Sequence, residues 1–157
     1  MDEQTLKLNL PEGWKLDFAV EDVESPDGDL WTFEKYDITP DESCGIAQIF
    51  ITKNYYPYEM DSAFENILSS AEDYLKDLQV PDSLRPSAMD FVKQCDVSGV
   101  EAFYIVYQEV GDPAAELLVV FEAPDRKMVW VHILIKDWAD GFGETSAIDS
   151  LSKMISF

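Results

Sequence analysis

The chain has few basic residues, a single histidine, two cysteines and no long apolar run. It contains 11 Lys and Arg and 32 Asp and Glu, which gives a formal net charge of −21 at pH 7. Such a surface repels phosphate backbones and anionic headgroups, so we expect no nucleic-acid partner. No apolar run approaches the roughly 20 residues that span a bilayer, so we expect no membrane insertion.

The scarcity of histidine and cysteine excludes several kinds of site. Metal sites that need two or three imidazoles cannot form from His132 alone. His132 falls between Trp130 and Leu134 in a strand pattern, which predicts a packed or partly buried residue. Cys44 and Cys95 have no Cys or His neighbour at ligand spacing, so no zinc site is expected. The two thiols either pair in an oxidising compartment or stay reduced as small buried side chains.

The first residues lack the basic and apolar regions of a secretory signal. We therefore expect a cytoplasmic protein. The alternative is an extracytoplasmic lipoprotein whose signal has been removed.

What the chain does contain is enough apolar material for one core. Its 157 residues are 46% hydrophobic and 13% aromatic, which predicts a single domain over 1–157.

The pattern of apolar residues predicts strands followed by a helix, a meander and a second helix. Short strands are expected at 6–10, 14–18, 30–33 and 46–52, with an acidic loop at 21–29 and another that follows residue 33 and runs through Glu42. Apolar residues at steps of three and four predict a helix over 61–78, begun by Ser62 and Glu65 as a capping box. Four β-rich runs at 89–95, 100–109, 115–122 and 128–136 follow, joined by short turns, and a C-terminal helix begins at Thr145 or Ser146.

The last strands are apolar on both faces. Val129, Val131, Ile133 and Ile135 alternate with Met128, Trp130, His132 and Leu134. A sheet that is wet on one face would alternate with polar residues, so we expect a helix on each face. The predicted fold class is α+β, a three-layer α/β/α sandwich with a mostly antiparallel sheet.

Short motifs at the two ends resemble a known superfamily. The order of elements runs from Leu10-Pro11-Glu12-Gly13-Trp14 through a helix and a Gly99 hairpin to Ile155-Ser156-Phe157. It resembles the PsbP-like superfamily, which includes the photosystem protein PsbP, Mog-type Ran-binding proteins and bacterial DcrB-like proteins. The resemblance implies an α/β/α sandwich with a non-catalytic accessory role, and many bacterial members are lipoproteins. It carries over no functional residue.

Acidic clusters raise the question of calcium. Glu21, Asp22, Glu24, Asp27 and Asp29 crowd one segment, and Asp37, Asp41 and Glu42 crowd the next. Their spacing does not match the EF-hand loop, and we predict no metal ligands.

Two aromatic segments are the candidate partner contacts. Tyr55, Tyr56 and Tyr58 surround a proline, and Trp138 and Phe142 flank glycine-containing loop sequence. Tyrosine and tryptophan are enriched at recognition surfaces. The alternative is that these side chains cover the start of a helix or the edge of the core.

We predict no catalytic residue and no cofactor. The expected function is that of a non-enzymatic accessory or binding domain that acts through protein–protein contacts. The alternative is a small-molecule or calcium-binding domain, and a hydrolase built on paired carboxylates ranks third.

Overall fold

A seven-stranded antiparallel sheet organises the chain, with strand order β2-β3-β4-β8-β7-β6-β5. The computed structural model describes residues 6–24, 26–28, 30–42, 45–55, 63–77, 87–107, 114–124, 127–136 and 144–157. The fold class is α+β, as the sequence predicted. The strands are β1 (Lys7–Leu8), β2 (Lys15–Glu24), β3 (Leu30–Thr39), β4 (Ile46–Tyr55), β5 (Lys93–Val97), β6 (Val100–Tyr107), β7 (Ala115–Glu122), β8 (Met128–Ile135) and β9 (Ile155–Ser156), and the helices are α1 (Ala63–Asp77), α2 (Ala88–Phe91) and α3 (Glu144–Met154).

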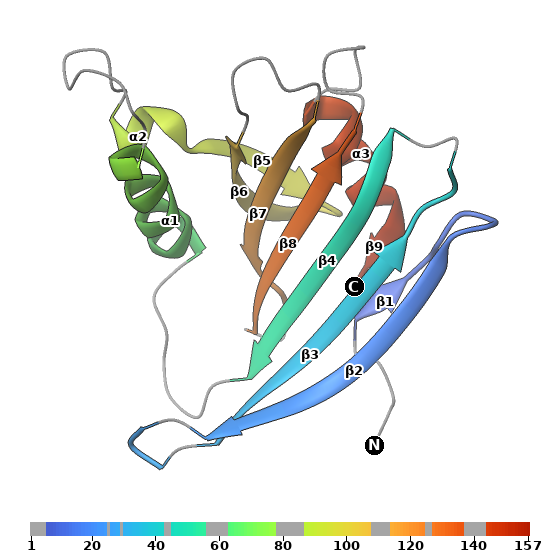
Figure 1. Ribbon diagram of the computed structural model, residues 1–157, viewed down its shortest axis with the longest axis horizontal. Helices are drawn as coiled ribbons and strands as arrows, with labels where there is room; N and C mark the ends of the chain where they lie inside the picture. Colours follow the sequence, from blue (N-terminus) through green and yellow to red (C-terminus); the bar gives the residue numbers. More distant parts are fainter. Residues whose placement is uncertain are drawn as a thin grey trace.

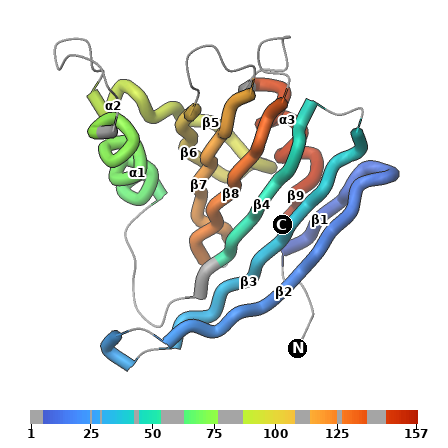
Figure 2. Tube along the Cα trace, viewed as in Figure 1, coloured from blue at the N-terminus to red at the C-terminus, as the bar shows by residue number. Residues whose placement is uncertain are grey.

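Helices α1 and α3 lie at different parts of the sheet (Figure 1). Helix α1 packs on β6 and β7, and α3 packs against β5 and β9. The short strands β1 and β9 pair with each other, so the first and last described segments run side by side (Figure 2). Strands β5 to β8 form the meander that the sequence predicted, because each is hydrogen-bonded to the next.

Apolar side chains form two clusters. The larger contains Val129, Val131 and Ile133 of β8 and Leu151 and Met154 of α3. It also includes a residue of β9, the strand that follows α3. The smaller contains Leu118 and Val120 of β7 together with Ile67 and Ala71 of α1. Successive residues of a strand point to opposite faces, so the two clusters lie on opposite faces of the sheet.

Several predicted boundaries were wrong, most of them in polar sequence. The predicted loop at 21–29 is strand as far as Glu24, and β3 continues past residue 33 to Thr39. Strand β2 pairs with β3 over its whole length. Main-chain pairing therefore keeps its acidic residues in a strand, although their sequence shows no apolar alternation. The run at 89–95 is divided between α2 and β5, and α3 begins at Glu144, one residue before the predicted cap.

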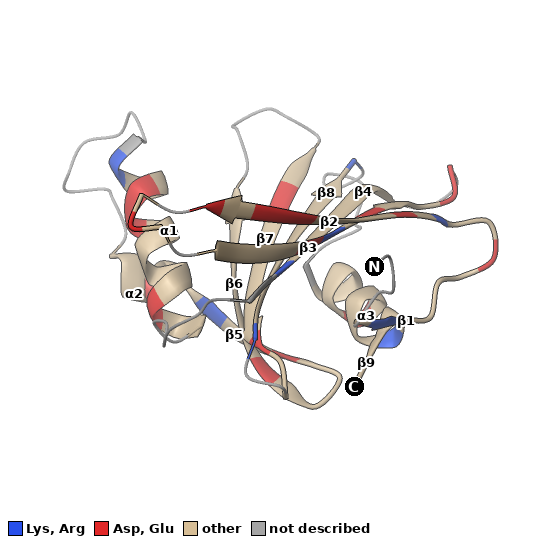
Figure 3. Cartoon of the chain, turned by 90° about the horizontal axis from the view of Figure 1, so that it is seen from below, with Lys and Arg blue, Asp and Glu red and all other residues tan. Residues whose placement is uncertain are grey.

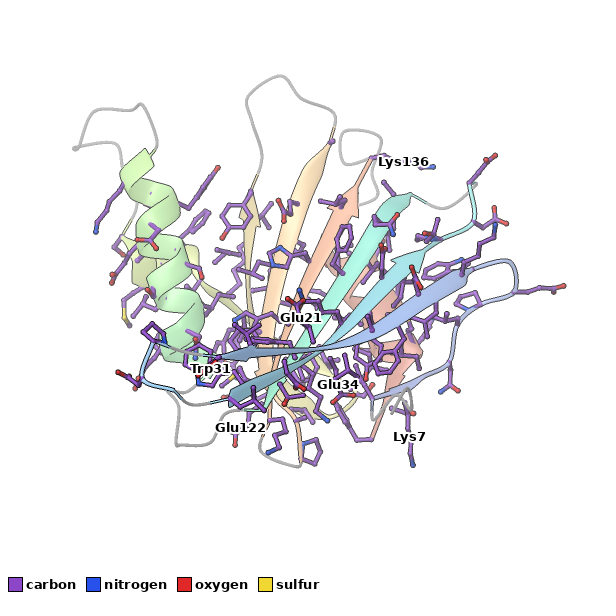
Figure 4. All side chains as sticks on the ribbon, turned by 60° about the horizontal axis from the view of Figure 1, so that its bottom comes forward. Lys7, Glu21, Trp31, Glu34, Glu122 and Lys136 are labelled. Atoms are coloured by element: carbon purple, nitrogen blue, oxygen red, sulfur yellow. The ribbon has the colours of Figure 1, made fainter. Side chains whose placement is uncertain are left out.

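Two buried charged residues lie on the face covered by the larger cluster. Glu34 of β3 and Lys53 of β4 are directly opposite in the register, and each is 3% exposed. The Tyr36 hydroxyl donates to Glu34 Oε1 at 3.0 Å and accepts from the Leu6 main-chain N–H at 3.0 Å. This chain of bonds ties the segment before β1 to the sheet. Figure 4 shows Glu34 and Glu21 on opposite sides of the β2–β3 ribbon.

Removing one member of this pair should destabilise the fold. Lys53→Met leaves the Glu34 carboxylate buried opposite an apolar side chain, which costs about 3–5 kcal/mol. Adding Glu34→Gln should recover most of that loss, because the amide still accepts from Tyr36. Urea unfolding measures both changes. Lys35→Met, on the exposed face of the same strand, is the control and should change the free energy of unfolding by less than about 1 kcal/mol. A Lys53→Met variant as stable as the unmodified protein would contradict the burial of Glu34 opposite Lys53.

Candidate functional site

The two faces of the sheet differ in how far they are covered. On the α1 face the register aligns one row across six strands: Asp17, Asp37, Phe50, His132, Leu118 and Ile105. Ile105 is 0% exposed and Leu118 is 5% exposed, whereas Phe50 is 40% exposed. The cover that α1 provides therefore ends between β7 and β4.

The width of a helix explains this limit. An α-helix with its side chains is about 10–12 Å across, and neighbouring strands are about 4.8 Å apart. One helix thus covers about two strands, which here are β6 and β7. Trp130 of β8 still packs against the smaller cluster. We call the part of the α1 face beyond it the open face; it includes Asp17, Ala19, Lys35, Asp37, Gln48, Phe50, Thr52, His132 and Leu134.

The opposite face is covered further. There Ile38, Ile49 and Ile133 align in one row and are all buried in the larger cluster. The sequence predicted cover over both faces of the sheet. That prediction was wrong for the part of the α1 face that lies on β4, β3 and β2, where Phe50 and Lys35 are exposed.

The open face contains a hollow of about 360 Å³. Ala19, the smallest of its lining residues, lies on β2 between Asp17 and Glu21 of the same face. The volume of the hollow falls within the range of roughly 300–1,000 Å³ that is usual for ligand pockets. Side chains of the open face that line it are Asp17, Ala19, Lys35, Asp37, Phe50 and Thr52.

The charges around the hollow are mostly negative. Asp17 and Asp37 are directly opposite each other, an arrangement that is unfavourable for two like charges. The Gln48 amide donates to Asp37 Oδ1 and also to Thr39 Oγ1, the latter at 3.1 Å. Lys35 Nζ lies 2.5 Å from Glu21 Oε2 in an exposed ion pair. The hollow therefore presents carboxylates beside an aromatic ring.

His132 lies on the open face and is partly buried, as its position in the strand predicted. Its Nδ1 is 2.8 Å from Glu116 Oε1. Its cross-strand neighbours are Phe50 and Leu118, and its neighbours on the same face of β8 are Trp130 and Leu134. None of these four side chains carries a nucleophilic atom.

Cys95 is a free thiol on β5, and its register partner is Ala102, whose side chain joins the larger cluster. Cys95 therefore lies on the face opposite to His132, and the structure does not bring the two together. Burial, followed by the nearby charge of Asp96, raises the pKa of the Cys95 thiol to about 12. A thiol with so high a pKa is almost entirely protonated at neutral pH and is a poor nucleophile.

Tyr107 borders the open face where α1 begins to cover the sheet. Burial, followed by the charges of Glu116, Tyr74 and Asp73, raises the pKa of Tyr107 to about 12. Its ring meets that of Tyr74 on α1 edge to face, with centroids 4.6 Å apart. The phenol therefore stays protonated and helps to anchor α1.

Among the described residues, the acidic clusters do not converge. Glu21 and Asp22 are successive residues of β2 and point to opposite faces; Glu21 pairs with Lys35, and Asp22 Oδ1 accepts from Thr32 Oγ1 at 2.7 Å. Within the described ranges, no group of three or more His, Cys, Asp or Glu could hold a metal ion.

The predicted aromatic contacts are largely untested by the structure. Tyr55 is the last residue of β4, and its side chain is not described. Tyr56, Tyr58, Trp138 and Phe142 lie outside the described residues. Phe50 is an exposed aromatic residue that sequence reasoning missed. The available signal was its alternation with Ile49 and Ile51, which leaves an apolar side chain on the outward face.

No helix among the residues that the structure describes is long and apolar enough to cross a membrane. No protein-family model, curated protein or solved structure matches this chain.

The raised pKa of Cys95 predicts low thiol reactivity in the native state. In a Cys44→Ser variant, where Cys95 is the remaining thiol, Ellman's reagent at pH 8 should label native protein at least about a hundredfold more slowly than protein unfolded in urea. The native rate, followed by absorbance, measures this directly. Similar rates in the native and unfolded protein would contradict the assigned burial.

Cys95 and Tyr107 together predict a loss of stability in alkali. The unfolded chain releases these protons from about pH 9 and pH 10, while the folded chain holds both until about pH 12. The folded state then binds more protons, so the free energy of unfolding falls as pH rises through this window. Tyr107→Phe should make this fall shallower in urea unfolding at pH 8, 9.5 and 10.5. Equal slopes for the variant and the unmodified protein would contradict the assignment to Tyr107.

Proposed function

We propose that this protein is a non-enzymatic binding domain that acts through protein–protein contacts at its open face. The observation that carries the proposal is the exposure of Phe50, at 40%, in the same row as the buried Leu118 and Ile105. Contiguous exposed apolar area marks interaction surfaces, and the diagonal neighbour of Phe50 on this face is the apolar, half-buried Leu134.

The arrangement of the open face resembles that of a protein interface. Phe50 and Leu134 supply apolar area, Trp130 borders it from the smaller cluster, and Asp17 and Asp37 lie toward the sheet edge as a polar rim. Transient interfaces commonly have such an apolar centre inside a polar rim. The net charge of −21 favours a partner with a basic surface.

The surroundings of the single histidine support a role without catalysis. His132 and Glu116 form a base-like pair, yet the register neighbours of His132 are apolar. General-base catalysis of a nucleophilic attack needs a nucleophile within hydrogen-bond reach of the imidazole. The protonated thiol of Cys95 is on the other face and cannot serve.

We also infer that the β5–β8 half of the molecule, with α1 and α3, forms the three-layer α/β/α sandwich expected from the sequence. The two apolar clusters on opposite faces support this. The PsbP-like resemblance stays a prediction, and its implied accessory role agrees with the proposed one.

The second candidate function is binding of a small molecule in the hollow of about 360 Å³. A ligand that binds only the folded state raises apparent thermal stability. Melting the protein with calcium and with a panel of small cationic and aromatic compounds at millimolar concentration tests this candidate. An unchanged melting temperature throughout would remove it.

Replacing Phe50 by aspartate should weaken partner binding. Protein captured by the unmodified chain from lysate of its source cells is purified and titrated by calorimetry. Phe50→Asp should raise the Kd at least about tenfold, because truncation or charging of a central interface aromatic costs about 2 kcal/mol or more.

The matched control is Met89→Asp. Met89 is the most exposed large apolar residue described, at 63%, and lies on α2 away from the open face. It should leave the Kd within about twofold. Equal weakening by both variants, or no effect of Phe50→Asp, would contradict the open face as the contact surface.

A further inference from the structure

The two edges of the seven-stranded sheet are protected in different ways. At one edge, β5 is five residues long and α3 packs against it. The Ser152 hydroxyl of α3 donates to the Asp96 main-chain carbonyl at 3.1 Å, and the Ser98 hydroxyl donates to the Ser152 carbonyl at 2.7 Å. At the other edge, β2 is ten residues long and, among the described strands, has β3 as its single neighbour.

Strand β2 is regular along its whole length, which suits it to pairing with another strand. Its register with β3 runs from Lys15 to Glu24 without a shift, whereas the β4–β8 ladder has an irregularity between Ile46 and Gln48. The segment contains no proline. Natural proteins usually interrupt a long edge with bulges, proline or a covering segment, because its free N–H and C=O groups pair readily with another strand. Within the residues that the structure describes, β2 has no bulge and no proline, and β3 is the one strand that pairs with it.

Charge is the protection that β2 does have. Asp17, Glu21, Asp22 and Glu24 outweigh Lys15, and Figure 3 shows the acidic residues along this strand. Antiparallel pairing of β2 with β2 of a second copy would bring carboxylates together, which is unfavourable. A strand that carries Lys or Arg would instead meet carboxylates on both of its faces. The charge of β2 therefore disfavours pairing with β2 of a second copy and favours pairing with a basic segment.

The hollow lies directly beside this edge. A strand added to β2 would place alternate side chains level with Asp17 and Ala19, on the open face. A cationic side chain there could reach Asp37 and the exposed ring of Phe50, both of which line the hollow. A cation near a carboxylate and an aromatic face is favoured on both counts.

We propose that β2 receives an extended, basic segment of a partner protein as an eighth strand of the sheet. The inference rests on the proposed function and names the partner class: an unfolded chain segment in which Lys or Arg recurs at every second residue. Main-chain hydrogen bonds to β2 supply affinity, and the carboxylates supply specificity.

The test uses ten-residue fluorescent peptides in which Lys alternates with Val, Thr or Ala, titrated with the full chain at 0.15 M salt. We expect saturable binding and chemical-shift changes confined to the amides of β2 and the open face. The same peptides N-methylated at alternate residues keep their charge and lose main-chain donors, and they should bind at least tenfold more weakly. Equal binding of methylated peptides, or no binding at 1 mM, would overturn the inference.

Two charge-reversed variants locate the site. Asp17→Lys/Glu21→Lys, which reverses two carboxylates on the open face of β2, should weaken binding of the unmethylated peptide at least tenfold. Glu72→Lys/Asp149→Lys changes the net charge equally at exposed positions of α1 and α3, and it should retain binding within about threefold. Equal losses in both would overturn β2 as the site. If Phe50→Asp abolishes binding of the natural partner while no peptide binds β2, the inference fails and the proposed function stands.

Discussion

The antiparallel pairing of β4 with β8 is the contact on which the rest of the structure depends. It joins the β2–β3–β4 strands to the β5–β8 meander and makes one sheet from two halves of the chain. On one face it aligns Ile49 with Ile133 and so extends the apolar floor beneath α3. On the other face it places Phe50 beside His132, where the cover that α1 provides has already ended.

The open face exists because α1 is too narrow to cover the whole of its side of the sheet. One helix covers about two strands, so α1 cannot reach past β7 on a sheet of seven strands. The other face has α3, supplemented by the β1–β9 pair, and is covered as far as β3. The acidic edge strand β2 borders the uncovered part. Its charge disfavours pairing of this edge with β2 of a second copy, and the partner segment that we propose for it is basic.

The sequence predicted best where side chains alone decide the structure. Strand β7 was predicted with both ends correct, because its residues are apolar on both faces and short turns bound it. Most of β2 was missed, because both faces of this edge strand are exposed to solvent and carry polar residues. The second half of β3 was missed because the buried Glu34, opposite Lys53, interrupts the apolar alternation. The exposure of Phe50 depends on where α1 settles, a non-local outcome that no local pattern records.

The open face is tested most directly by hydroxyl-radical footprinting, which compares residues of one type within one protein. Phe50 is 40% exposed, whereas Phe121 on β7 is 0% exposed in the larger cluster. The half-covered sheet predicts rapid oxidation of Phe50 and protection of Phe121 until the protein unfolds. Equal protection of both phenylalanines in the free, folded protein would mean that the face is covered, and it would contradict the account.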